Sequence, residues 1–143
     1  MKMTDNKLQL NGIPSVDVMR VWEDIQYLLK SALEYADHKY TIFDVQYALM
    51  SRDMQLWLVT TDDDVIQSMI ITQIVQYPNK KVMFFVFAAG VKSNEWIHFI
   101  DHFKEFAAEH QCHAIEVLGR AGWEKKFKSL GFTKVHTVYS LPL

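Results

Sequence analysis

The sequence contains few of the residues that mark disulfide scaffolds or flexible linkers. Of its 143 residues, one is cysteine, three are proline and five are glycine. The single cysteine, Cys112, cannot form a disulfide within the chain, which is typical of a reducing compartment. Because no stretch is rich in glycine, serine or proline, the sequence predicts a single domain over residues 1–143.

An excess of positive charge and long hydrophobic runs are also lacking. The 15 Lys and Arg residues are balanced by 17 Asp and Glu residues, for a net charge of -2. A chain without a positive field does not hold nucleic acid by bulk charge, which excludes non-specific DNA or RNA binding. The richest apolar stretch, Val82–Val91, has only the length of a strand. We therefore predict a cytoplasmic protein that binds neither nucleic acid nor a membrane.

Hydrophobic residues make up 50% of the chain, enough for one well-buried core, and their spacing predicts two helices in the first third. Over Val16–Ala36 the apolar residues share one side of a helical wheel, and Ser15 is the expected N-cap. Thr41 and Asp44 have the spacing of a capping box, which predicts a second, shorter helix ending near residues 51–53.

The middle of the chain changes to the pattern of β-strands. Three runs of β-branched and aromatic residues, separated by short turns, predict sequential antiparallel strands over Gln55–Thr61, Val65–Gln76 and Lys81–Ala88. The third run is apolar on both faces, as expected of a strand covered by helices on both sides. The run Asp62–Asp64 fits a solvated turn between the first two of these strands.

The remaining segments complete a mixed pattern of helices and strands. We expect a short first strand at Lys7–Leu10, ended by the Asn-Gly pair that follows it. After the central strands we expect a helix over Asn94–His110, a strand over Cys112–Leu118, a helix over Trp123–Leu130 and a last strand over Phe132–Leu141. The predicted order is β-α-α-β-β-β-α-β-α-β.

This order and the segment Lys128-Ser-Leu-Gly-Phe132 resemble the GCN5-related N-acetyltransferase (GNAT) superfamily. Leu130 can anchor the helix, Gly131 can supply a left-handed turn and Phe132 can start the next strand. The resemblance covers residues 16–141. It implies an α/β fold with a central mixed, mostly antiparallel sheet flanked by helices on both faces.

The resemblance also implies an activity, the transfer of an acetyl group from acetyl-CoA to a small-molecule or protein amine. In that family the pantetheine lies in a splay between two central strands, and the pyrophosphate lies on backbone N–H groups of a glycine-rich loop. The cofactor-binding residues implied here are Phe87, Ala88, Ala89, Gly90 and Val91 through the backbone, and Lys92, Ser93 and Asn94 for the phosphates. This loop is degenerate, because Gly90 has no second glycine after it.

Two residues are candidates for acid–base chemistry. Glu116, in the penultimate predicted strand, is the candidate base for the amine. Many GNAT enzymes place an acidic tyrosine on the last helix, three residues before the Leu-Gly-Phe leucine, and that position here is Phe127, which has no proton to give. The role of the acid is therefore absent, taken by another group such as Tyr139, or unnecessary.

A non-catalytic role is the competing prediction. The segment Arg120-Ala-Gly-Trp123 is similar to small GNAT-like phage proteins, which implies a virion or accessory protein that binds a protein partner in the host cytoplasm or the virion. The missing second glycine and Glu95 favour this alternative, whereas the retained strand-loop-helix order favours the enzyme.

Histidine and cysteine spacings do not predict a metal site. His98 and His102 are four residues apart, a chelating spacing, but they fall on the face opposite the apolar stripe of the helix. His110, Cys112 and His113 form a second, weaker candidate group at a helix-strand junction, where Cys112 fits a small core residue better. We predict no metal.

Overall fold

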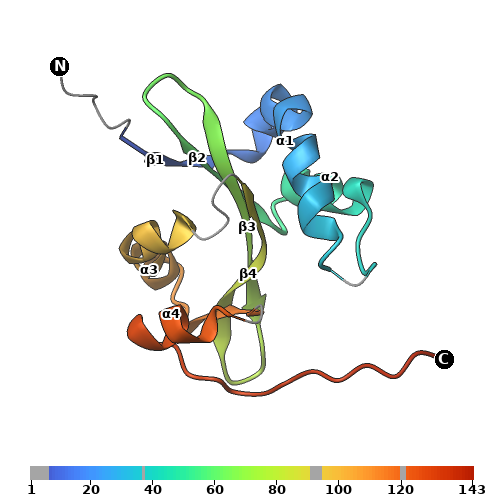
Figure 1. Ribbon diagram of the computed structural model, residues 1–143, viewed down its shortest axis with the longest axis vertical. Helices are drawn as coiled ribbons and strands as arrows, with labels where there is room; N and C mark the ends of the chain where they lie inside the picture. Colours follow the sequence, from blue (N-terminus) through green and yellow to red (C-terminus); the bar gives the residue numbers. More distant parts are fainter. Residues whose placement is uncertain (1–6, 37, 91–94, 120–121) are drawn as a thin grey trace.

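The protein is built around one five-stranded sheet (Figure 1). The computed structural model describes residues 7–36, 38–90, 95–119 and 122–143. The strands follow one another in the sheet in sequence order, and every neighbouring pair is antiparallel except the parallel pair β4 and β5. Their bounds are β1 Gln9–Ile13, β2 Gln55–Thr60, β3 Ile66–Gln76, β4 Lys81–Gly90 and β5 Ala114–Val117.

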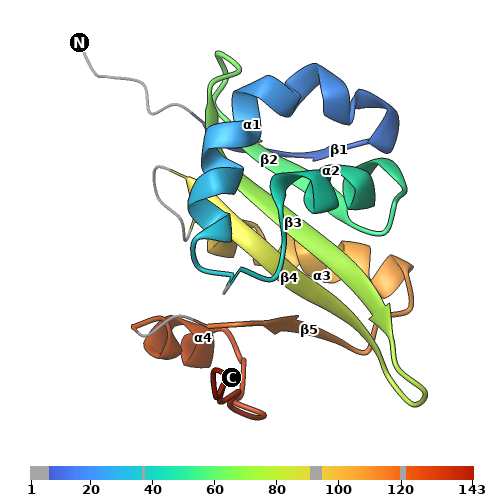
Figure 2. The ribbon, with the colours of Figure 1, turned by 90° about the vertical axis from the view of Figure 1, so that its right-hand side faces the viewer.

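Helices cover both faces of this sheet (Figures 1 and 2). On one face lie α1 (Val18–Leu33), preceded by the 3-10 turn η1 (Ser15–Asp17), and α2 (Ile42–Met50). On the other lies α3 (Ile100–Glu109), preceded by the 3-10 segment η2 (Glu95–Phe99), while the short α4 (Glu124–Ser129) follows β5. The predicted fold class, a mostly antiparallel mixed sheet between helices, is confirmed. No helix of the described residues is long and apolar enough to cross a membrane.

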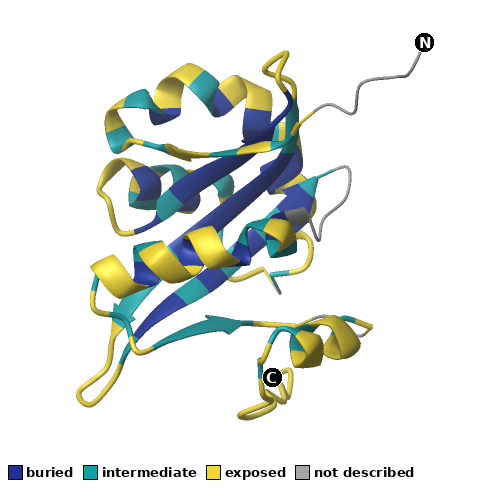
Figure 3. Ribbon diagram, turned by 90° about the vertical axis from the view of Figure 1, so that its left-hand side faces the viewer, coloured by how far each residue is buried: buried dark blue, intermediate teal, exposed yellow. Residues whose placement is uncertain are grey.

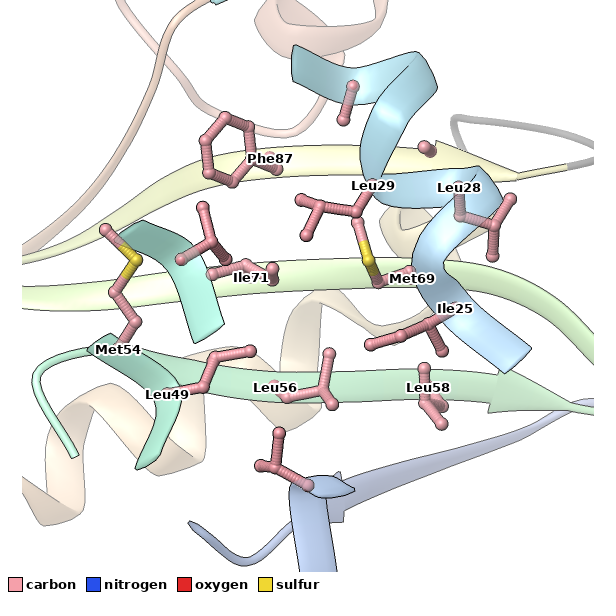
Figure 4. Close-up of a cluster of buried hydrophobic side chains, with 14 of the residues drawn as sticks. Ile25, Leu28, Leu29, Leu49, Met54, Leu56, Leu58, Met69, Ile71 and Phe87 are labelled. Carbon is pink, nitrogen blue, oxygen red and sulfur yellow. The ribbon is translucent and has the colours of Figure 1, made fainter. Parts of the chain in front are cut away.

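The core has two halves, one on each side of the sheet. Figure 3 shows that the central strands are buried along much of their length, and Figure 4 shows the half of the core that lies beneath α1 and α2. Side chains of successive β3 residues alternate between them: Met69 and Ile71 pack beneath α1 and α2, and Ile70 packs beneath α3. All three are fully buried. The strand is therefore apolar on both faces because both faces are covered.

The first two elements differ from the prediction. β1 continues through Asn11 and Gly12 instead of ending there, because Gly12 lies opposite Trp57 in the sheet and has no side chain to meet its ring. A Cβ at Gly12 would lie 3.3 Å from Trp57 Cζ3. Ser15 is not the N-cap of α1 but the first residue of η1, and its Oγ accepts a hydrogen bond from Arg52 Nε at 3.3 Å.

The capping box that starts α2 is confirmed. Thr41 Oγ1 accepts a hydrogen bond from the Asp44 backbone N–H at 3.2 Å, and Asp44 Oδ2 accepts one from the Thr41 N–H at 2.8 Å. The backbone and side-chain hydrogen bonds from Thr41 stabilise the carboxylate, so the pKa of Asp44 is lower than its ordinary value.

The predicted last strand, Phe132–Leu141, is wrong. Phe132 packs into the core, but residues 133–143 form no strand and are exposed. The alternation of side chains in this segment has the character of a strand, yet a strand also needs a neighbouring edge to pair with, and sequence alternation does not supply one. The described part of the chain therefore ends its secondary structure at α4.

Candidate functional site at the divergence of β4 and β5

The two parallel strands separate halfway along β4. Their pairing runs from Val82 opposite Ala114 to Phe85 opposite Val117. β5 ends there, but β4 continues to Gly90. Beyond Phe85, one edge of β4 thus has no strand beside it in the described residues, which produces the splay that the resemblance implied.

A β-bulge lies in β4 at the point where the splay opens. Thr72 of β3 pairs with Phe85, whereas its neighbour Ile71 pairs with Phe87, which leaves Val86 as an extra residue. In a regular strand Phe85 and Phe87 would point to the same face. Here Phe85 packs with α3, and Phe87 packs on the opposite face with α1. The bulge therefore reverses which face of the sheet the following β4 side chains point to. Bulges are common beside active sites, where they change the direction of the backbone or of a side chain.

An aromatic cluster closes the α3 side of the splay. The ring of Trp96, at the start of η2, lies 4.7 Å from that of Phe85, 6.4 Å from that of Trp123 and 6.3 Å from that of Phe127. Trp96 is fully buried, and its Nε1 has no hydrogen-bond partner among the described residues. A buried N–H donor without an acceptor is costly, so a polar atom supplied by a ligand would stabilise it.

The predicted cofactor-binding residues fall partly within this splay. Phe87 and Ala89 bury their side chains beneath α1, and Ala88 packs on the α3 side, so what this stretch presents to a ligand is its backbone. Val91, Lys92, Ser93 and Asn94 lie outside the described residues. The phosphate-binding half of the predicted site is therefore not part of the described geometry.

Position 90 requires a glycine for a structural reason that the sequence did not indicate. A Cβ atom there would lie 2.3 Å from the carbonyl oxygen of Gln67 and 2.6 Å from Ser68 Cα. β3 and β4 could not approach this closely with any other residue at position 90. The glycine is therefore needed for the close packing of β3 and β4 at this end of the sheet, independently of phosphate binding.

Glu116 lies at the base of the splay. It is half-buried, one residue before the last paired residue of β5. Its neighbours Ile115 and Val117 pack into the core half beneath α3. Since side chains alternate along a strand, Glu116 points to the face that carries α1 and α2. A carboxylate at this position can accept a proton from a group that enters the splay from that face.

The candidate acid Tyr139 and Phe127, which stands at the position of the family's tyrosine, have different surroundings. Tyr139 lies in the segment after α4 and is 90% exposed. Phe127 is half-buried and packs against Trp96 and Phe132. It is a packing residue of the aromatic cluster.

The remaining candidates do not form a site among the described residues. No group of three or more His, Cys, Asp or Glu side chains in the described ranges could hold a metal ion. His110 Nδ1 lies 2.9 Å from the Phe106 carbonyl oxygen, and His113 Nδ1 accepts a hydrogen bond from the Lys81 N–H. Burial raises the pKa of the Cys112 thiol, against a smaller lowering by Lys81, so the reactive thiolate is disfavoured. Asp62–Asp64 lie between β2 and β3, in the turn that the sequence predicted.

Three features of the site were not predicted from the sequence. The bulge at Val86 depends on the register with β3, the unpartnered N–H of Trp96 depends on its burial, and the need for glycine at position 119 depends on α4. The position of a glycine directly after an apolar strand could have drawn attention to Gly119.

No protein-family model and no curated protein sequence matches this chain. Solved structures do match it. Aminoglycoside N-acetyltransferase AAC(6')-Iy in complex with CoA has a TM-score of 0.69 at 13% identity, covering 100% of this chain and 99% of that one. A ribosomal-protein-alanine N-acetyltransferase from Brucella melitensis biovar Abortus 2308 has 0.67 at 13% identity, covering 96% and 99%. A predicted acetyltransferase with acetyl-CoA from Clostridium acetobutylicum has 0.63 at 11% identity, covering 95% and 96%. The chain therefore has the fold of the GNAT acetyltransferases.

Proposed function

We propose that the protein is an acetyl-CoA-dependent N-acetyltransferase that acts on an amine. The observation that carries this proposal is the bulge at Val86, placed where β4 loses its β5 partner. A strand that is re-aimed at the mouth of an open splay offers its backbone to an extended ligand. The acetyltransferase fold and the names of two neighbours, one with CoA and one with acetyl-CoA, support the same reading.

The described part of the splay fits the arm of this cofactor. Backbone groups of Phe87 to Gly90 would hold the pantetheine along the open edge of β4, and Lys92, Ser93 and Asn94 remain the predicted phosphate contacts. The buried, unpartnered N–H of Trp96 is a donor that a bound ligand could satisfy. When bound, acetyl-CoA would supply an acetyl thioester whose carbonyl carbon an amine can attack.

Glu116 is the proposed base. An amine enters as an ammonium ion at neutral pH and must lose a proton before its nitrogen can form the new C–N bond. Glu116 is half-buried at the base of the splay and points to the α1 and α2 face. Its carboxylate would accept that proton directly or through one water. The acceptor would therefore reach the splay from the side of α1 and α2.

The position on α4 where the family has its tyrosine supplies no proton for the departing sulfur. Phe127 stands where the family's tyrosine is expected, and its ring is occupied by contacts with Trp96, Trp123 and Phe132. A thiolate that leaves this site would take its proton from water rather than from the position 127 side chain. Loss of one general acid slows such a reaction by about a hundredfold to ten-thousandfold, which still leaves a measurable rate.

A surface on α2 favours a second candidate function, binding to a protein partner without turnover. Phe43 and Tyr47, each 73% exposed, and Met50 recur at the spacing of one helix face. They line a shallow hollow of about 370 Å³ together with Gln46 and Ser51. Exposed apolar side chains grouped in this way are common at protein interfaces. A binding protein would need this face and would leave the splay unused.

Titration calorimetry with acetyl-CoA separates the two functions. The enzyme predicts saturable binding, weakened at least tenfold in a Lys92→Glu variant, because the substitution reverses a charge expected beside the phosphates. Desulfo-CoA serves as the control for thiol chemistry. Absence of heat and of a thermal shift at millimolar acetyl-CoA would overturn the proposal and favour the binding protein.

A second experiment tests the base. Acetylation of a panel of small-molecule and peptide amines, followed by mass spectrometry, should fall about a hundredfold or more in a Glu116→Gln variant. Binding of acetyl-CoA should not change in that variant. Glu109→Gln, on an exposed position of α3, is the matched control and should retain full activity. Equal activity of the two variants would remove Glu116 from the mechanism.

A further inference from the structure

We propose that a hollow between the α2–β2 turn and β3 binds a free amino acid with an aliphatic side chain, held as a zwitterion by Arg52 and Asp53. The splay lies on the β5 side of β4, whereas this hollow lies on the β2 side of β3. The two sites are therefore separate, and the proposal does not depend on the acetyltransferase activity.

The hollow forms where β2 begins. β2 starts at Gln55, opposite Thr72, whereas β3 runs on to Gln76. Beyond Thr72, the β2 side of β3 thus has no strand beside it in the described ranges. A hollow of about 610 Å³ opens there, within the range of about 300–1,000 Å³ that is typical of small-molecule sites. The chain between β1 and α1, the α2–β2 turn, β3 and the C-terminal end of α3 line it (Figure 2).

Two opposite charges line this hollow without pairing. Neither Arg52 nor Asp53 forms an ion pair with the other or with any other described residue. Arg52 Nε donates a hydrogen bond to Ser15 Oγ at 3.3 Å, which holds the side chain and leaves its two terminal nitrogen atoms for a carboxylate. Asp53 Oδ2 accepts a hydrogen bond from Ser51 Oγ at 3.2 Å, which leaves Oδ1 for an ammonium group. A ligand that carries both charges would satisfy both side chains.

The backbone at Arg52 is costly for an arginine. Its φ of 71° lies in the left-handed region, which residues other than glycine and asparagine rarely adopt. A glycine would make this turn after α2 with less strain. Strained residues of this kind gather at binding sites, where the side chain is needed in that place. The strain therefore favours a role for the guanidinium group as a ligand contact.

An amide donor and an apolar floor define the rest of the ligand. Gln55 Oε1 accepts a hydrogen bond from Thr72 Oγ1 at 2.9 Å, which fixes the amide and leaves its NH₂ group as a second donor for a carboxylate. Leu49 and Met54 line the hollow as buried side chains, and Val16, 79% exposed, lies at its rim. These side chains would cover an aliphatic group. Asp53 would repel a phosphate or a second carboxylate, so an aliphatic amino acid fits better than a dianion.

Titration calorimetry on the full chain tests the class of ligand. L-leucine is the probe, and N-acetyl-L-leucine and L-leucinamide each lack one of its two charges. We expect saturable binding of L-leucine and binding at least tenfold weaker for each of the other two, because one charged contact is lost. Absence of binding by L-leucine, L-isoleucine and L-methionine at millimolar concentration would overturn the proposal. Equal binding of N-acetyl-L-leucine would also overturn it, because Asp53 would then hold no ammonium group.

Variants of the two charged residues test the contacts. Arg52→Gly and Asp53→Asn should each weaken the binding of L-leucine at least tenfold. Arg52→Gly should unfold at a temperature no lower than that of the unaltered chain, because glycine adopts the left-handed backbone without strain, so unfolding would not explain its loss of binding. Arg20→Gln and Asp24→Asn, at exposed positions of α1, are the matched controls and should bind L-leucine normally. Normal binding by Arg52→Gly would overturn the proposal.

A last comparison separates this hollow from the splay. Glu116→Gln should bind L-leucine as the unaltered chain does, and Arg52→Gly should bind acetyl-CoA as the unaltered chain does. Amide resonances of residues 52–55 should shift when L-leucine is added. Loss of L-leucine binding in Glu116→Gln but not in Arg52→Gly would place the amino acid in the splay and overturn the proposal. Failure of acetyl-CoA to bind any form of the protein would contradict the proposed function alone.

Discussion

A Cβ atom on Gly119 would lie 2.8 Å from Cε2 of Phe127, so the chain leaving β5 touches the α4 ring with no room for a side chain. The ring cannot move aside easily, because Trp123 and Phe132 pack against it at 5.6 and 5.3 Å between centroids. This contact fixes the β5 side of the splay to α4. It also explains why the position that resembles the family's acidic tyrosine works here as a packing site.

Gly119→Ala is therefore expected to destabilise the protein by about 1–3 kcal/mol, the usual cost of adding a methyl group where the packing leaves no room for it. Urea unfolding would measure the change. In a Phe127→Leu background, where the ring is absent, the same substitution should cost less than half as much. Equal costs in the two backgrounds would show that the contact does not constrain residue 119.

Gly90→Ala tests the close approach of β3 and β4 at the other side of the splay. The new Cβ would meet the backbone of Gln67 and Ser68, which cannot rotate away as a side chain can. We expect a loss of about 3 kcal/mol in the free energy of unfolding.

Gly131→Ala is the control for the Gly90 prediction. Gly131 has a φ of 93° but nothing within 4 Å of its Cβ position. Its substitution should lower the free energy of unfolding only by the cost of placing alanine in a left-handed conformation, about 1–2 kcal/mol. A Gly90 variant as stable as the Gly131 variant would show that the strands can separate there without penalty.

Most of the elements could be predicted from the sequence because their signals are local. The capping box of Thr41 and Asp44 and the apolar period of α1 each depend on residues within a few turns of one another. β4 was predicted as a central strand because its apolar residues run without alternation. Such local patterns predict an element without any knowledge of the distant segments that pack against it.

What could not be predicted depends on distant partners. The pattern of residues 132–141 indicates a strand but not the edge that would receive it, and residues 133–143 form no strand. The bulge at Val86 is set by the register of β3, which no local spacing encodes. The splay itself was implied by a family resemblance, and Glu116 was placed near it by the same route.

The third prediction concerns two linked side-chain hydrogen bonds between β2 and β3. Trp57 Nε1 donates to Thr72 Oγ1 at 2.9 Å, and the same hydroxyl donates to Gln55 Oε1 at 2.9 Å. Thr72→Val keeps the shape of the side chain but leaves the indole N–H without an acceptor. We expect a loss of about 1–3 kcal/mol in the free energy of unfolding, measured with urea. Thr72→Ser retains the hydroxyl and should cost about 1 kcal/mol for the missing methyl group. The prediction fails if the valine variant is the more stable of the two.

The capping box of α2 makes stability depend on pH through Asp44. Hydrogen bonds from Thr41 lower the pKa of this carboxyl in the folded protein below its value in the unfolded chain. Its contribution is therefore complete above the unfolded pKa and is lost as the pH falls through the folded pKa. We expect Asp44→Asn to be less stable than the unaltered chain at neutral pH, with the difference closing in acid. Thr41→Ala, which removes the reciprocal bond, should cost about 1 kcal/mol at neutral pH, and Thr41→Ser should restore most of it. Thermal unfolding across this pH range measures all three, and a difference between Asp44→Asn and the unaltered chain that stays constant into acid would contradict the assignment.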